Sequence, residues 1–153
     1  VRVVHEQHKV LAAIHLREPL ENVLQTAREL QPRRLICLFG CGGDRDRTKR
    51  PVMGRAVTSL ADLAIITSDN PRSENPLDII EEIRRGVSTG AYRVEPDRAA
   101  AIRAAVREAR AGDIVLLCGK GHEDYQEFEQ GRRVHFDDRE VAAAALDEAM
   151  GRA

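Results

Sequence analysis

Hydrophobic positions along the chain follow two different spacings. Three short runs are apolar almost throughout, which is typical of strands buried on both faces. These runs lie at 34–40, 63–67 and 113–118. Between them, apolar residues recur at intervals of three and four, which predicts one buried face of a helix. The helical stretches begin at Pro19, near Met53, at Pro76 and near Ile102, and a last one covers 139–150.

The order of these elements predicts an α/β fold with three layers and a mostly parallel sheet. A weaker strand is expected at 92–95. Residues 125–128 and 132–136 flank Gln130 and Gly131 and predict a hairpin, which we expect to add an antiparallel edge to the sheet. Gly112 is expected to end the fourth helix, and Asp137 or Asp138 to cap the last one. Residues 1–18 have weak periodicity and predict no element.

Composition narrows the class of protein. The 153 residues are enough for one domain with its own core. Lys and Arg number 24 against 25 Asp and Glu, so the net charge of −1 disfavours a nucleic-acid binder or a basic membrane module. No apolar run reaches the roughly 18 residues of a membrane-spanning helix. The three cysteines lack CxxC spacing, which disfavours zinc and a disulfide framework and favours the cytoplasm.

Each of the three apolar strands is followed by a loop rich in glycine and polar side chains. The loops cover 41–49, 68–75 and 119–124. Ligands of open parallel sheets bind beyond the carboxyl ends of the strands. We therefore expect the three loops to meet at one crevice.

The first loop contains Gly42 and Gly43, which would let backbone N–H groups approach an anion. Its arginines could bind a carboxylate or phosphate in a forked manner. The loop does not have the GxxxxGK[ST] spacing of a nucleotide phosphate loop. The alternative is a solvated loop whose charges pair with one another. The charged residues are Asp44, Arg45, Asp46, Arg47, Lys49 and Arg50.

The second loop holds Asp69, Asn70, Pro71 and Arg72 in a row. Pro71 stiffens this segment. An acid, an amide and a guanidinium together suit a zwitterionic ligand, since the acid can bind an ammonium group and the guanidinium a carboxylate. The alternative is a turn that caps the next helix.

The third loop runs from Gly119 to Glu123 and offers three side chains to a ligand. Lys120, His122 and Glu123 could each face the crevice. His122 could act as a general base, although it could equally be hydrogen-bonded to Glu123. No second His or Cys at ligand spacing supports a metal site. His5 and His8 are interpreted as surface residues.

Five ordered motifs resemble the C-terminal domain of the Mur ligases, in particular the members that add meso-diaminopimelate. The resemblance runs from about Leu20 to Leu146. The motifs are Phe39-Gly-Cys-Gly-Gly-Asp-Arg-Asp46 with Lys49-Arg-Pro-Val-Met-Gly54, Thr67-Ser-Asp-Asn-Pro-Arg72, Gly112-Asp113, Gly119-Lys-Gly-His-Glu-Asp-Tyr-Gln126 and Phe136-Asp-Asp-Arg-Glu-Val141.

The resemblance implies a Rossmann-like domain of an ATP- and Mg²⁺-dependent amide ligase of peptidoglycan synthesis. In the family, ATP phosphorylates the terminal carboxylate of UDP-MurNAc-L-Ala-D-Glu, and the amine of the incoming amino acid attacks the acyl phosphate. This domain would bind that amino acid, meso-diaminopimelate. The substrate-binding residues implied by the motifs are Arg45, Asp69, Asn70, Pro71, Arg72, Gly119 and Glu123.

Two departures from the family pattern separate the functional hypotheses. The family's N-terminal and central ATPase domains are missing from these 153 residues, so we expect no catalytic residue, no metal and no bound ATP or Mg²⁺ in this chain alone. The family opens the domain with a nucleotide-contacting segment, of which only His15 and the end survive within Leu11–Glu21. We therefore assign 19–153 to the domain and leave 1–18 unassigned. The competing hypothesis is a non-catalytic module that binds amino acids or a protein partner.

Overall fold

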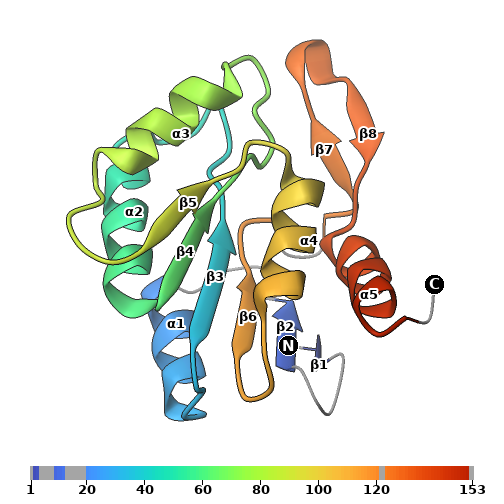
Figure 1. The fold of residues 1–153 in the computed structure, drawn as a ribbon. Helices are drawn as coiled ribbons and strands as arrows, with labels where there is room; N and C mark the ends of the chain where they lie inside the picture. The colour runs from blue at the N-terminus through green and yellow to red at the C-terminus, as the bar shows by residue number, and fades with distance from the viewer. Residues whose placement is uncertain (1, 4–8, 13–19, 121–122, 152–153) are drawn as a thin grey trace.

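The central feature of the fold is a six-stranded sheet covered by helices on both faces (Figure 1). The computed structural model describes residues 2–3, 9–12, 20–120 and 123–151. The strand order is β1-β2-β6-β3-β4-β5, and every pair from β2 to β5 is parallel. The strands are β1 (Arg2–Val3), β2 (Lys9–Ala12), β3 (Leu35–Phe39), β4 (Leu63–Ile66), β5 (Tyr92–Val94) and β6 (Ile114–Leu117).

The described residues form five α-helices, which supply the two outer layers. They are α1 (Leu20–Glu29), α2 (Lys49–Leu60), α3 (Pro76–Arg84), α4 (Arg98–Glu108) and α5 (Asp138–Ala149). Helices α1, α2 and α3 lie on one face of the sheet, and α4 and α5 lie on the other (Figure 1). The predicted three-layer, mostly parallel α/β fold is confirmed.

Alternation of side chains along the buried strands explains the two cores. In β3, Leu35, Cys37 and Phe39 belong to the core under α1, α2 and α3. Ile36 and Leu38 belong to the core under α4 and α5. Successive residues of a strand point to opposite faces, so a strand covered on both sides must be apolar at every position. The continuous apolar runs in the sequence reflect this requirement.

Polar side chains fix the starts of three helices. The side chains of Asn75, Asp97 and Asp137 accept hydrogen bonds from backbone N–H groups in the first turns of α3, α4 and α5. Asp137 is therefore the cap of the last helix. Gly112 does not end α4, which stops at Glu108 before the extended residue Ala109. Gly112 instead has a φ of +84° in the turn that leads into β6.

The predicted hairpin forms, but it does not extend the main sheet. Strands β7 (Tyr125–Glu127) and β8 (Arg133–His135) make a separate antiparallel pair, joined through the short 3-10 helix η1 (Glu129–Gly131). In Figure 1 this pair projects beyond the sheet. The reason is topological: β6, which precedes the hairpin, already has β2 and β3 as neighbours. The antiparallel edge of the sheet is β1, within a segment that the sequence pattern left unassigned.

The strand order reverses between β3 and β6. The chain runs from β3 outward to β4 and β5 and then returns through α4 to the other side of β3. Such a switch point opens a crevice at the carboxyl ends of the strands. The loops after β3, β4 and β6 lie at this edge: a Cβ added to Gly40 would be 2.5 Å from the Thr67 carbonyl oxygen, and one on Gly119 would be 3.4 Å from the Gly40 carbonyl oxygen. None of the helices in the described ranges is long and apolar enough to cross a membrane.

Candidate functional site

A cavity of about 830 Å³ opens at the switch point. Its polar lining includes Arg45, Asp69 and Gly119, one residue from each of the three loops. The helices α1 and α2 supply an apolar part of the lining. It consists of Leu20, Val52, Met53 and Ala56. The cavity can therefore receive a ligand that carries both charged groups and a hydrocarbon segment.

Two of the charged side chains in this lining, those of Arg45 and Asp69, have unused bonding capacity. Arg45 is exposed and makes no hydrogen bond or ion pair with the residues that the structure describes. The Oδ1 atom of Asp69 is buried and has no hydrogen-bond partner among the same residues. Burial raises the pKa of Asp69, and the neighbouring cations Arg98 and Lys120 oppose that shift. A carboxylate in this condition would gain from a cationic ligand group.

Asn70 joins the second loop to the third loop and to the hairpin. Its side chain is almost fully buried. Its Nδ2 donates to Glu123 Oε2 at 2.8 Å, and its Oδ1 accepts from Lys120 Nζ and from the backbone N–H of Glu127, both at 3.0 Å. The Asn70 carbonyl oxygen accepts from Gly43 N at 2.8 Å. The Gly43 N–H is therefore occupied within the protein instead of facing an anion.

Lys120 does not face the crevice, contrary to our expectation. Only 1% of the residue is exposed. Its ammonium group donates to Asn70 Oδ1 and to the Tyr125 carbonyl oxygen. The sequence pattern could not reveal this, because a lysine between two glycines in a loop is normally solvated.

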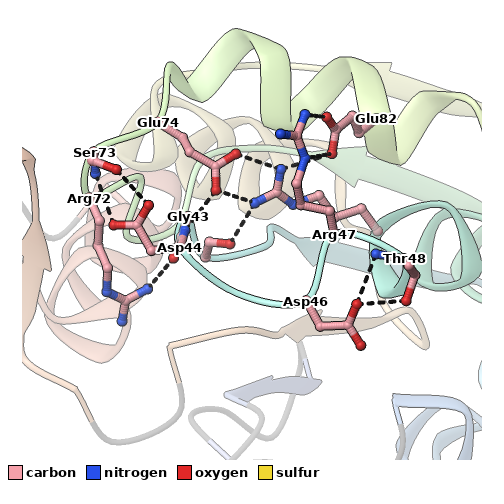
Figure 2. A network of polar contacts seen from close by, with 11 residues as sticks. Gly43, Asp44, Asp46, Arg47, Thr48, Arg72, Ser73, Glu74 and Glu82 are labelled. Atoms are coloured by element: carbon pink, nitrogen blue, oxygen red, sulfur yellow. Dashed lines mark hydrogen bonds and ion pairs between the residues drawn. The ribbon is translucent and has the colours of Figure 1, made fainter.

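Arg72 crosses from the second loop to the first. Its backbone is left-handed, with a φ of +50°, and its N–H donates to the Glu127 carbonyl oxygen at 3.0 Å. Its Nη1 donates to the Gly43 carbonyl oxygen at 2.8 Å, as Figure 2 shows. The contact between the loops is tight, since a Cβ on Gly43 would lie 1.9 Å from the Pro71 carbonyl oxygen. Nη2 of Arg72 makes no hydrogen bond within the described part of the chain.

Several charges of the first loop are paired inside the protein, but their partners lie outside the loop, whereas the alternative interpretation expects them to pair with one another. Buried Arg50 contacts Glu74 through both terminal nitrogens, at 2.7 and 2.8 Å, and its Nη1 also contacts Glu82 Oε2 at 2.8 Å. Arg47 also pairs with Glu82, and Asp44 accepts from the Ser73 hydroxyl at 2.5 Å (Figure 2). These contacts tie the first loop to the second loop and to α3, and leave Arg45 to the cavity.

Acid should weaken this connection. Hydrogen bonds from Arg50 lower the pKa of Glu74 from 4.5 to about 2. A carboxyl with a depressed folded-state pKa stabilises the fold above its unfolded-state pKa, and this contribution is lost as the pH falls from about 4.5 to about 2. In urea unfolding measured across this range, Glu74→Gln should flatten the fall in unfolding free energy. Glu81→Gln, which changes an exposed carboxylate on α3, serves as the control and should keep the wild-type slope; equal slopes in all three proteins would contradict the assignment.

A buried ion pair beneath the loops was missed by sequence reasoning. Arg98, at the start of α4, donates to both oxygens of Asp138 at 2.7 and 2.6 Å. It also donates to the carbonyl oxygens of Ser68 and Cys118, at 3.2 and 3.0 Å. Arg98 therefore fastens the ends of β4 and β6. Forty residues separate the two partners, and no motif spacing could have identified them.

Some residues considered from the sequence lie outside the described residues. These are His5, His8, His15 and His122. Across 2–3, 9–12, 20–120 and 123–151, no group of three or more His, Cys, Asp or Glu side chains is arranged to hold a metal ion.

Comparison with known proteins identifies relatives of the chain. The pattern of the family described as "Mur ligase, glutamate ligase domain" matches residues 9–121. UDP-N-acetylmuramoyl-L-alanyl-D-glutamate--2,6-diaminopimelate ligase from Synechocystis is 55% identical over 136 residues, covering 86% of this chain and 26% of the relative. The enzyme of the same name from Nostoc is 57% identical over 135 residues, covering 88% and 27%. The chain thus spans about a quarter of the length of these relatives.

One solved structure supports the same family, and a second supports the fold. A structure of a UDP-N-acetylmuramoyl-L-alanyl-D-glutamate--2,6-diaminopimelate ligase superimposes with a TM-score of 0.83 at 37% identity, covering 97% of this chain and 31% of the other. A murein peptide ligase from Psychrobacter arcticus has a TM-score of 0.56 at 15% identity, which supports the fold alone. Together with the family match over residues 9–121, the 55% identity shows that this chain belongs to the Mur ligase family.

Proposed function

We propose that this chain is the amino-acid-binding domain of a ligase that adds meso-diaminopimelate to UDP-MurNAc-L-Ala-D-Glu. The observation that carries the proposal is the meeting of three polar loops at one cavity, with Arg45 and Asp69 in its lining. The relatives at 55–57% identity are named for the same amino acid. ATP and Mg²⁺ would serve the reaction in the full-length enzyme, which would act in the cytoplasm.

The proposed contacts follow from the charges of the ligand. meso-Diaminopimelate has a carboxylate and an ammonium group at each end of a short hydrocarbon segment. Arg45 and Arg72 would bind carboxylates through their guanidinium groups. Asp69 and Glu123 would accept hydrogen bonds from ammonium groups, with Asn70 beside them. Pro71 and Gly119 would shape the walls of the cavity. Gly119 has a φ of +117°, a backbone conformation that residues with a side chain rarely adopt.

The test uses the full-length protein that carries this chain. Supplied with ATP, Mg²⁺, UDP-MurNAc-L-Ala-D-Glu and meso-diaminopimelate, it should release ADP and phosphate and form the UDP-MurNAc-tripeptide, and L-lysine should be a much poorer substrate. The 153-residue chain should bind meso-diaminopimelate but form no tripeptide, because the GxxxxGK[ST] motif is absent from it.

A non-catalytic module that binds amino acids is the second candidate. It predicts binding of meso-diaminopimelate without tripeptide formation by the full-length protein. Failure to bind the amino acid at all would contradict both candidates.

A further inference from the structure

Lys120 is a buried cation to which the proposed ligand contacts assign no role. Its side chain is inaccessible to solvent, and its Nζ lies 3.0 Å from Asn70 Oδ1 and 3.8 Å from Asp69 Oδ1. Removing an ammonium group from water is costly, and an apolar side chain would fill the same space at a lower cost. The contacts of Lys120 show what its charge contributes in return.

Lys120 and the Glu127 backbone N–H together determine which way the Asn70 amide faces. Two donors, the Lys120 ammonium and the Glu127 backbone N–H, point at one end of this amide. That end must be the oxygen, because the NH₂ group cannot accept a hydrogen bond. The NH₂ group is consequently held toward Glu123, where it donates to Oε2 at 2.8 Å.

The Asn70 amide in turn holds the carboxylate of Glu123. Only one oxygen of this carboxylate is used by Asn70, and an ionised carboxylate accepts about four hydrogen bonds. Glu123 is half-buried, so its remaining capacity faces a partly dehydrated environment. A carboxylate fixed in this manner can receive an ammonium group without first being ordered.

The charges nearby favour a cationic ligand group. Arg98 and Asp138 form a mutual pair, which leaves Lys120 opposite two carboxylates, Asp69 and Glu123. Burial lowers the pKa of Lys120, and the two carboxylates oppose that shift. One additional positive charge would balance the group, and the ammonium of the ligand would supply it.

We propose that Lys120 is a positioning residue for ammonium recognition: through the Asn70 amide, it holds the Glu123 carboxylate in place for the distal ammonium group of the amino acid. The inference rests on the proposed function, because it presumes a diamino acid in the crevice. Lys120 itself does not touch the ligand.

The experiment compares two ligands that differ by one ammonium group. Dissociation constants of the 153-residue chain for meso-diaminopimelate and for 2-aminopimelate, which lacks the distal amino group, can be measured by NMR titration. Wild type should bind meso-diaminopimelate roughly tenfold or more tightly than 2-aminopimelate. Lys120→Met should remove this preference, because it should weaken the binding of meso-diaminopimelate and leave the binding of 2-aminopimelate unchanged. Its Asn70 side-chain amide resonances should also shift in the absence of ligand.

Two further variants serve as a second test and as a control. Asn70→Asp keeps an acceptor for Lys120 and for the Glu127 N–H, but its carboxylate repels that of Glu123. This variant should also lose the preference for meso-diaminopimelate over 2-aminopimelate, and it provides a test if Lys120→Met fails to fold. Arg34→Met removes an ion pair with Asp113 at the opposite edge of the sheet and should leave both affinities unchanged.

The results separate the inference from the function on which it rests. Equal weakening of both ligands by Lys120→Met would show a merely structural role and overturn the inference, while the proposed function stands. Unshifted Asn70 amide resonances in Lys120→Met would overturn the inference whether or not ligands bind. A wild-type chain that binds neither ligand would overturn the proposed function.

Discussion

Replacing Arg98 by methionine is expected to lower the free energy of unfolding by about 3–5 kcal/mol, the cost of leaving one partner of a buried ion pair without the other. Arg98 has no exposed side-chain surface, and the Asp138 side chain is only 6% exposed. The variant also loses the hydrogen bonds to the carbonyl oxygens of Ser68 and Cys118. Urea unfolding of the chain at neutral pH gives the measurement.

An exposed ion pair provides the matched control. Arg93 pairs with Glu108, but 60% of the Arg93 side chain is exposed. Arg93→Met should therefore cost at most about 1 kcal/mol. The double variant Arg98→Met with Asp138→Leu should recover much of the lost stability, because it removes the orphaned carboxylate. An Arg98→Met protein that unfolds at the same urea concentration as Arg93→Met would refute the assignment.

Reversing the charge of Arg72 is expected to weaken the binding of meso-diaminopimelate by roughly 10- to 150-fold, with a much smaller effect on the binding of L-lysine. A partly shielded guanidinium–carboxylate pair contributes about 1.5–3 kcal/mol, and 1.4 kcal/mol corresponds to a factor of ten. L-Lysine has no distal carboxylate to lose. The measurement is the Michaelis constant of the full-length Arg72→Glu protein for each of the two amino acids.

The hydrogen bond from Arg72 to the Gly43 carbonyl oxygen introduces a competing explanation, because this arginine also connects two loops. Arg72→Gln keeps a donor for that oxygen without the charge and should fall between wild type and Arg72→Glu. Arg133→Glu reverses a charge that also contacts Glu127 but lies on β8, and should alter neither constant. Equal losses for both amino acids in Arg72→Glu would mean that Arg72 holds the loop and does not select the ligand.

The layers of the fold were predictable because each is encoded locally. The runs at 34–40 and 63–67 are apolar at nearly every position, and the structure places β3 and β4 within them. Strand β2 was missed, since Lys9–Ala12 is a short segment at the edge of a weakly patterned region and its pairing with β6 spans about a hundred residues. The placement of the hairpin was wrong because strand order is a property of the whole sheet.

The candidate site was only partly predictable. The order of strands and loops in the sequence correctly predicted that the three loops meet, and Arg45, Asp69 and Gly119 line the cavity. The motif residues themselves could not reveal which side chains turn inward. The Asn70 side chain makes its hydrogen bonds to neighbours on two other segments, and Lys120 donates to the hairpin that follows it. Such long-range burial leaves no trace in local spacing.

The detached hairpin has a consequence for how the domain can unfold. Its links to the rest of the molecule include Asn70 and Arg72, through the bridge to Phe128 and the two backbone contacts of Glu127, while its strands add nothing to the main sheet. Elements held by few contacts open in sub-global steps well below the global unfolding free energy. Opening of the hairpin would release the Asn70 amide, so the crevice can lose its preorganised form while both hydrophobic cores remain intact.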